Sequence, residues 1–339
     1  MNIRERFHAV MNADPSLDFG PVIEWATWWD KTIRFWEGEG LPAGMNQQEL
    51  FKYFGLDRFY QLWITSRTPD FPQAPSHGAA IISNEAEYMS LRPKLYPKDA
   101  VERILPRIEE ALPLAESGEA IIWYTLDGYF WFPRTLLGIE PHLYAFYDQP
   151  KLYHRMCEDL LEFELGVVEK LSRYIKADFM TFAEDLSYNN GPMLSKEMFE
   201  TFMAPYYRQL TPEIKRKGTR VIVDSDGDIA LCTPWFIDCG VEGILPLEKQ
   251  AGVDIAALQD KYPEFLFIGG FDKMCLFRGK EAIDAEFRRI LPMLRKGRYI
   301  PSIDHQTPPT VTLENYKYYV SQLRRFSAQA CADARPRVD

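Results

Sequence analysis

The stretch Arg-Val-Ile-Val-Asp-Ser-Asp-Gly-Asp at residues 220–228 decides the fold. Three β-branched residues in a row give way at once to acids and a glycine. The stretch Asp-Phe-Met-Thr-Phe-Ala-Glu-Asp at residues 178–185 repeats this pattern. Short, continuous apolar runs are typical of strands that are buried on both faces of a parallel sheet. Both stretches therefore predict parallel strands that carry carboxylates at their C-terminal ends.

The same pattern recurs along the chain. Segments with helical periodicity separate the runs, and residues 150–176 give the clearest case, with leucines, valines and a methionine along one face. This alternation is typical of β/α units. Eight runs qualify as strands, at residues 21–25, 60–64, 120–124, 178–183, 220–223, 243–245, 265–268 and 298–300.

Eight strands that alternate with helices predict a (β/α)8 TIM barrel. A doubly wound open sheet is disfavoured because no G-x-G-x-x-G motif follows the first strand. We expect one domain over residues 1–339, with a short N-terminal extension and the barrel at about 18–327. Residues 79–83 are interpreted as a small inserted hairpin, and residues 328–339 as a frayed tail.

Composition excludes several classes of function. The chain has 339 residues, 39 basic and 49 acidic, which gives a net charge of −10, and no segment gathers basic residues into a patch. Binding to nucleic acid or to an anionic membrane is therefore disfavoured. No apolar run approaches the roughly 18 to 20 residues of a membrane span, and residues 1–16 are too charged for a signal peptide. We expect a soluble, cytoplasmic protein, with assembly as a homodimer left open.

Acids gather at the predicted strand ends. Because barrel enzymes build their sites at the C-terminal ends of the strands, these side chains are expected to share one mouth. Several carboxylates in one place repel each other unless they are protonated or neutralised by a cation. We predict a divalent metal, with zinc as the first choice, held by Asp224, Asp226 and His305, since oxygen and imidazole ligands together suit zinc, iron, manganese or nickel.

A structural role competes with each of these assignments. Residues 224–228 also suit an Asx-type turn and a helix N-cap. Glu184 and Asp185 are predicted to be catalytic, in proton transfer or in orienting a substrate hydroxyl, but a buried structural pair is an equal alternative. Five further residues lie at or just after predicted strand ends and are assigned to substrate binding: Glu24, Trp25, Trp28, Asp127 and Tyr129.

Several motifs carry a family resemblance. They are Asp-Gly-Tyr-Phe-Trp at 127–131, Glu-Asp at 184–185 with Asn-Gly-Pro-Met-Leu-Ser at 190–195, the acidic stretch at 224–228, and Ile-Pro-Ser-Ile-Asp-His at 300–305. With these the sequence resembles the uroporphyrinogen decarboxylase superfamily from its start to about Phe326. The resemblance implies a (β/α)8 barrel. The superfamily also contains methyltransferases that move methyl groups between corrinoid proteins and thiols such as coenzyme M.

The resemblance implies two different activities. The decarboxylases bind substrate carboxylates with arginines in an Arg-Gln-Ala-Gly-Arg-like segment, whereas residues 24–30 here read Glu-Trp-Ala-Thr-Trp-Trp-Asp. The methyltransferases hold zinc with a His-x-Cys pair and a further Cys, and Asp224, Asp226 and His305 stand at those places. We therefore expect a methyltransferase-like enzyme that acts on a small thiol or oxygen substrate, with cobalamin carried by a corrinoid partner protein. Uroporphyrinogen decarboxylation and non-catalytic ligand binding by the barrel are the alternatives.

Overall fold

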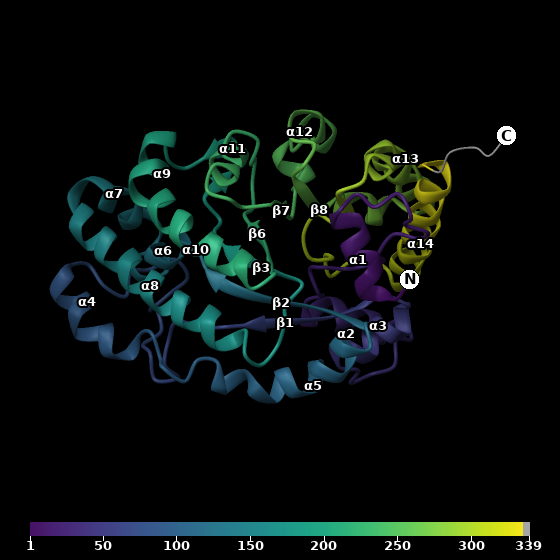
Figure 1. Ribbon diagram of the computed structural model, residues 1–339. Helices are drawn as coiled ribbons and strands as arrows, with labels where there is room; N and C mark the ends of the chain where they lie inside the picture. Colours follow the sequence, from purple (N-terminus) through teal and green to yellow (C-terminus); the bar gives the residue numbers. More distant parts are fainter. Residues whose placement is uncertain (335–339) are drawn as a thin grey trace. The chain divides into compact units, whose positions relative to one another are not determined.

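A computed structural model shows an α/β protein and describes residues 1–334 (Figure 1). Nine strands are present: β1 (Arg58–Trp63), β2 (Ala120–Asp127), β3 (Phe179–Ala183), β4 (Ser187–Tyr188), β5 (Gly191–Pro192), β6 (Arg220–Asp224), β7 (Gly243–Leu245), β8 (Leu266–Phe271) and β9 (Tyr299–Ile303).

The helices lie before the first strand, between the strands and, in the case of α14, after the last strand. They are α1 (Ile3–Met11), α2 (Asp30–Gly38), α3 (Gln47–Phe54), α4 (Glu85–Leu91), α5 (Leu105–Glu116), α6 (Trp131–Leu137), α7 (Ile139–Asp148), α8 (Pro150–Leu171), α9 (Lys196–Phe202), α10 (Ala204–Arg216), α11 (Thr233–Ile237), α12 (Ile255–Lys261), α13 (Lys280–Lys296) and α14 (Leu313–Ala334).

Seven strands form the main sheet, in the order β1-β2-β3-β6-β7-β8-β9, while β4 and β5 make a separate two-stranded hairpin. Apart from the hairpin, every pair with an assigned register is parallel. The chain divides into two compact units. Unit 1 comprises Met1–Tyr60, Leu114–Ile121 and Gly243–Asp339, and unit 2 comprises Gln61–Pro113 and Ile122–Glu242. The expectation of a single domain stays a prediction.

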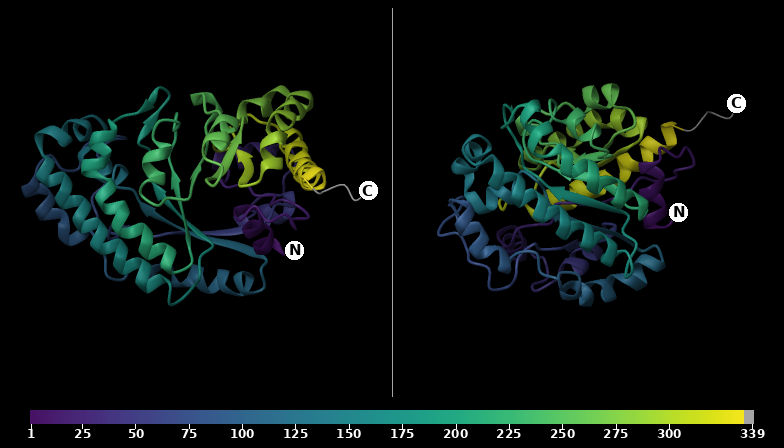
Figure 2. Two further views of the ribbon diagram at one scale, coloured as in Figure 1. Left: turned by 45° about the horizontal axis from the view of Figure 1, so that its top comes forward. Right: turned by 60° about the vertical axis from the view of Figure 1, so that its left-hand side comes forward.

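In unit 2, β3 lies between β2 and β6. Asp127 pairs with Ala183, and Ala183 pairs with Asp224. This register brings the last residues of the three strands to one edge, as parallel pairing requires. Helices α8 and α10 pack against each other, and α10 also packs against β6 (Figure 2). The long helix α8 buries one face, which confirms the periodicity at residues 150–176.

In unit 1, β8 lies between β7 and β9. Phe271 pairs with Ile303, so Asp272 and Asp304 follow the strands at the same edge. Helices α13 and α14 pack against each other, and α13 also covers β9 (Figure 2). All five residues of β9 are buried, as are all six of β8. Burial on both faces explains why these strands read as continuous apolar runs.

The prediction of a strand at residues 21–25 is wrong. Within residues 1–334 no strand is assigned there. Two of its N–H groups donate to side chains, and the Asp57 N–H donates to the Val22 carbonyl at 2.8 Å without a continuing ladder. The Val22 N–H donates to the Asp57 carboxylate at 2.9 Å, and the Trp25 N–H donates to the Ser302 hydroxyl at 3.2 Å. The segment therefore lies beside β9 without forming a ladder.

Two smaller expectations also fail. Residues 79–83 form no hairpin, since the N–H groups of Ile81 and Ile82 both donate to the Leu136 carbonyl at the end of α6. The predicted frayed tail begins too early, because α14 continues to Ala334 and buries Ala330. Residues 335–339 lie outside the part of the chain that the structure describes. Across residues 1–334, none of the helices combines the length and the apolarity that a membrane crossing requires.

Candidate active site

Three carboxylates meet at the C-terminal ends of β3 and β6 in unit 2. Each of Asp185, Asp224 and Asp226 offers an oxygen, and the three oxygens lie within 4.8 Å of one another. All three residues are partly buried. We call this group the carboxylate trio. The arrangement follows from the register, because Ala183 pairs with Asp224 and the next residues of both strands leave the sheet together.

The backbone conformation at two residues, Asp185 and Gly227, shapes the loops that carry the trio. Asp185 adopts a left-handed conformation with φ of 43°, which is unusual for a residue other than glycine. The preceding Glu184 N–H still donates to the Asp224 carbonyl at 2.9 Å, so the chain leaves the sheet only at Asp185. Gly227 then lies against the β4–β5 hairpin, and a Cβ there would stand 2.7 Å from the Tyr188 nitrogen. Only glycine fits at this contact.

The negative charges of the trio repel one another, and a bound cation would neutralise them. Burial, followed by the charges of Asp185 and Asp226, raises the pKa of Asp224 well above its usual range. Either Asp224 is protonated or a positive ion neutralises the group. Carboxylate oxygens are hard ligands that suit Mg²⁺, Mn²⁺, Ca²⁺ or, with imidazole, Zn²⁺. The donor set thus fits a divalent cation.

Glu184 points away from solvent and holds the start of α6. Its side chain is fully buried, and one carboxyl oxygen accepts the N–H groups of Phe130 at 2.9 Å and Trp131 at 3.1 Å. The other oxygen accepts the Tyr207 hydroxyl. A Cβ at Gly128 would stand 1.9 Å from this carboxyl group. Burial raises the pKa of Glu184 to about 8. These contacts favour the structural alternative, and its catalytic role stays a prediction.

Asp127 and Tyr129, both assigned to substrate binding, have different environments. Asp127 ends β2, accepts the Ser66 hydroxyl at 2.6 Å, and has its pKa raised by burial. Tyr129 is fully buried and donates its hydroxyl to Glu164 at 3.0 Å. Its ring packs edge-on against Tyr207 in the core of unit 2. Asp127 therefore stands at the sheet edge that holds the trio, whereas Tyr129 supports the core beneath it.

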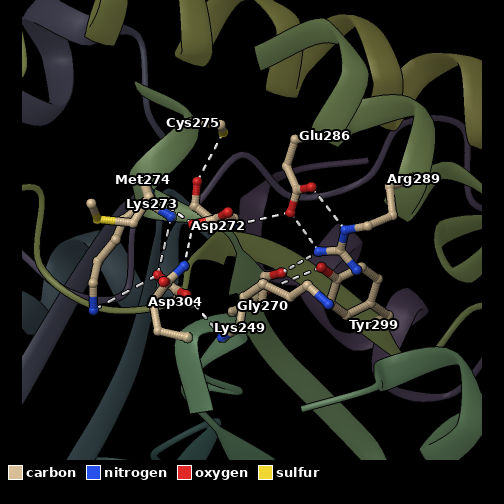
Figure 3. A network of polar contacts seen from close by, with 12 residues as sticks. Lys249, Gly270, Asp272, Lys273, Met274, Cys275, Glu286, Arg289, Tyr299 and Asp304 are labelled. Carbon is tan, nitrogen blue, oxygen red and sulfur yellow. Dashed lines mark hydrogen bonds and ion pairs between the residues drawn. The ribbon is translucent and has the colours of Figure 1, made fainter. Parts of the chain in front are cut away.

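In unit 1, Asp304 ties three strand ends together (Figure 3). It follows β9, is fully buried, and accepts the backbone N–H of Lys249, after β7, at 2.9 Å and that of Lys273, after β8, at 3.2 Å. The Lys273 ammonium lies 3.5 Å from Glu248 and 4.0 Å from Asp304. Burial raises the pKa of Asp304 to about 6. Lys273 is not among the residues predicted from the sequence, although this lysine directly follows Asp272 at the end of β8.

His305 also belongs to unit 1. Its ring meets the Trp25 ring edge-on, with the centroids 6.5 Å apart, and the Trp25 indole N–H donates to the Ile303 carbonyl at 2.8 Å. Burial, with the Lys273 ammonium second, lowers the pKa of His305. A neutral imidazole is the form that binds metals. The ligation of a metal by His305 together with Asp224 and Asp226 stays a prediction.

Glu24 and Trp28, two further residues assigned to substrate binding, lie in the core of unit 1. Trp28 packs among Trp36, Phe51, Phe54 and Tyr316. Glu24 is fully buried, accepts hydroxyl hydrogen bonds from Ser302 and Tyr316, and has its pKa raised to about 8 by burial. Both side chains stabilise the segment beside β9, and their contact with a substrate remains a prediction.

The buried Glu24 should make stability depend on pH. Its folded pKa of about 8 exceeds the ordinary value of 4.5, so rising pH ionises the acid in the unfolded chain before it does so in the folded one. Stability is therefore lost as pH rises from about 4.5 towards 8. Between about pH 5 and 7, the free energy of unfolding should fall by about 2 to 3 kcal/mol more in the wild type than in Glu24→Gln.

Urea denaturation across that pH range measures the difference. The exposed Glu116→Gln, in the same unit, is the matched control and should follow the wild type. Parallel curves for the wild type and Glu24→Gln would contradict a raised pKa at this carboxyl.

The sequence itself matches a family model. The model for uroporphyrinogen decarboxylase (URO-D) covers residues 124–326, more than half of the chain. The chain belongs to the URO-D family. The matched range includes the carboxylate trio together with Glu184, Asp304 and His305.

The chain is also similar to solved structures. A methyltransferase from Methanosarcina mazei is similar with a TM-score of 0.71 and 15% identity, over 96% of this chain and 99% of that one. A putative vitamin-B12 independent methionine synthase from Listeria monocytogenes has a TM-score of 0.46 and 11% identity, over 94% and 98% of the two chains. No curated protein sequence matches the chain. The first similarity shows that this URO-D family member shares its fold with a methyltransferase.

Proposed function

We propose that this URO-D family member is a methyltransferase-like enzyme. It would transfer a methyl group between a corrinoid protein, which carries cobalamin, and a small thiol or oxygen substrate. The observation that carries this proposal is the carboxylate trio, which offers three oxygens within 4.8 Å at the end of the sheet where such folds keep their chemistry. The fold shared with the Methanosarcina mazei methyltransferase adds support. We also propose a (β/α)8 barrel, with residues 21–25 standing beside β9 in place of a regular strand.

A divalent cation would complete this site. Asp185, Asp224 and Asp226 would hold it, and His305 is the predicted imidazole ligand. A bound cation would lower the pKa of a thiol or hydroxyl group of the substrate and so favour its attack on a methyl group. Three carboxylates form a harder site than thiolates would, which favours magnesium, manganese or an oxygen-ligated zinc.

Decarboxylation of uroporphyrinogen is the second candidate, because the family description favours it. The residues of unit 1 argue against it. Residues 24–30 contain no arginine. The Glu24 carboxyl group is buried and accepts hydrogen bonds from the hydroxyl groups of Ser302 and Tyr316. A substrate that bears many carboxylates needs cationic partners such as arginine to be held. Nothing in this segment supplies one.

Two assays on the purified protein distinguish the candidates. In the first, methylcobalamin is incubated with coenzyme M or with a phenol, and the appearance of cob(I)alamin is followed by absorbance. The methyl group moves from cobalt to sulfur or oxygen, and the cobalt–carbon electron pair stays on cobalt. In the second, uroporphyrinogen is supplied and released CO₂ is measured. We expect methyl transfer that EDTA abolishes, and no decarboxylation.

Uroporphyrinogen turnover without methyl transfer would reverse the order of the two candidates. Retention of a small ligand without turnover in either assay, and without any need for metal, would instead support a binding barrel.

A further inference from the structure

Unit 2 contains a cavity that the proposed chemistry does not use. It has a volume of about 480 Å³ and lies between α8 and the segment 92–101. Pockets for small molecules typically have volumes of this size. Its apolar lining is formed by Leu95, Pro97, Ala100, Val101, Phe163 and Val167.

Polar contacts fix both ends of this cavity. At one end, the Arg92 guanidinium makes a two-pronged ion pair with Asp159 on α8, with distances of 2.7 and 2.8 Å. At the other end, the Lys170 ammonium donates to the Lys98 carbonyl at 3.1 Å and pairs with Glu102. The segment 92–101 thus contacts α8 through polar groups at two places, and the cavity lies between these two places. The cavity is therefore preformed.

One of the residues of α8 at the cavity is an exposed glycine. Gly166 lies in the interior of this 22-residue helix, where glycine is less stable than alanine, and it lines the cavity. A Cβ at this position would meet no atom within 4 Å. The packing of the protein itself therefore does not require glycine at this position. A long side chain here would extend into the space that a ligand would occupy, whereas a methyl group would not fill it.

The rim supplies one unpaired cation. Within residues 1–334 the exposed Lys98 ammonium makes no ion pair, whereas Arg92 and Lys170 are already paired with acids. Glu162, which also lines the cavity, is exposed on α8. Among the residues that line the cavity, the three cations Arg92, Lys98 and Lys170 outnumber the two acids Asp159 and Glu162. An apolar group with an acidic end complements this arrangement.

We propose that the cavity between α8 and the segment 92–101 binds a small amphipathic anion. Its apolar body would lie over Gly166 against Phe163, and its acidic group would meet Lys98. This site is separate from the carboxylate trio and does not depend on the function proposed for the trio.

Two fluorescent probes test the site on the full-length protein: 8-anilinonaphthalene-1-sulfonate, which is an anion, and N-phenyl-1-naphthylamine, which is neutral. Gly166→Leu places a side chain in the cavity and should weaken binding of both probes at least about tenfold. Gly166→Ala adds only a methyl group into open space and should leave binding close to that of the wild type. Both variants should be at least as stable as the wild type, since both residues favour helices.

Lys98→Gln separates the apolar and the charged contributions. It should weaken binding of the anionic probe about threefold to tenfold and leave the neutral probe unchanged. Absence of probe binding to the folded wild type, or equal binding by Gly166→Leu and Gly166→Ala, would overturn the site. Equal effects of Lys98→Gln on both probes would overturn the assignment to an anion.

Discussion

Asp224→Asn is expected to weaken divalent-cation binding at least about 100-fold, since loss of a direct ligand should exceed the 10- to 100-fold effect of losing its supporting contacts. Asp224 contributes one of the three oxygens that meet within 4.8 Å, and asparagine keeps the shape but removes the charge. The unfolding free energy without metal should stay the same or rise. The reason is that the neighbouring Asp185 and Asp226, together with burial, already raise the pKa of this carboxyl.

Isothermal titration with Mg²⁺, Mn²⁺ and Zn²⁺, together with elemental analysis of the protein as purified, measures the loss. Asp238→Asn is the matched control, because Asp238 is an exposed aspartate of the same unit, outside the trio, whose side chain makes a 3.8 Å ion pair with Lys196. Undiminished cation binding by Asp224→Asn would exclude the trio as the metal site. Methyl transfer should fall with the metal content.

His305→Ala tests whether an imidazole completes the site. If His305 is a ligand, the variant loses zinc more than magnesium, since imidazole suits zinc and carboxylate oxygens suit magnesium. If cation binding is unchanged for all three metals, His305 is not a ligand. Its ring contact with Trp25 would then indicate a role in packing.

The sequence predicted the sheet well where the strands are buried on both faces. The run at residues 220–223 became β6, and the run at 243–245 became β7 with the same ends. Such strands need only apolar, β-branched residues, which one segment of sequence displays by itself. Residues 21–25 look the same in sequence. Their hydrogen-bond partners, however, include the side chains of Asp57 and Ser302, which are distant in the sequence, so no local pattern predicts these bonds.

The sequence predicted which strand ends carry the site, but not which side chains at those ends come together. The rule that acids follow barrel strands located Glu184, Asp185, Asp224 and Asp226. It could not distinguish the environment of Glu184 from that of Asp185. Side chains of adjacent strand residues point to opposite faces, and Asp185 in addition has a left-handed backbone conformation. Nor could it assign Asp185 to the metal group, since that depends on the register between β3 and β6.

The largest expected loss of stability is that of Glu184→Ala, at about 3 to 5 kcal/mol. Alanine would leave the buried N–H groups of Phe130 and Trp131 and the Tyr207 hydroxyl without their acceptor, and would open a cavity beside Gly128. Unsatisfied buried donors and a new cavity each destabilise a fold.

Glu184→Gln should be far milder. Burial raises the pKa of Glu184 to about 8, so the acid is largely neutral at pH 7, and a neutral amide can replace it. The amide oxygen can accept both backbone N–H groups, while the amide nitrogen donates to Tyr207. Urea denaturation of both variants at about pH 7 gives the comparison, and the cation affinity measured in parallel shows whether the trio is intact. A Glu184→Gln variant as unstable as Glu184→Ala would mean that the carboxyl is ionised and that its charge, not its shape, holds α6. A stable Glu184→Gln variant that has lost methyl transfer would instead assign the proton of Glu184 to the reaction.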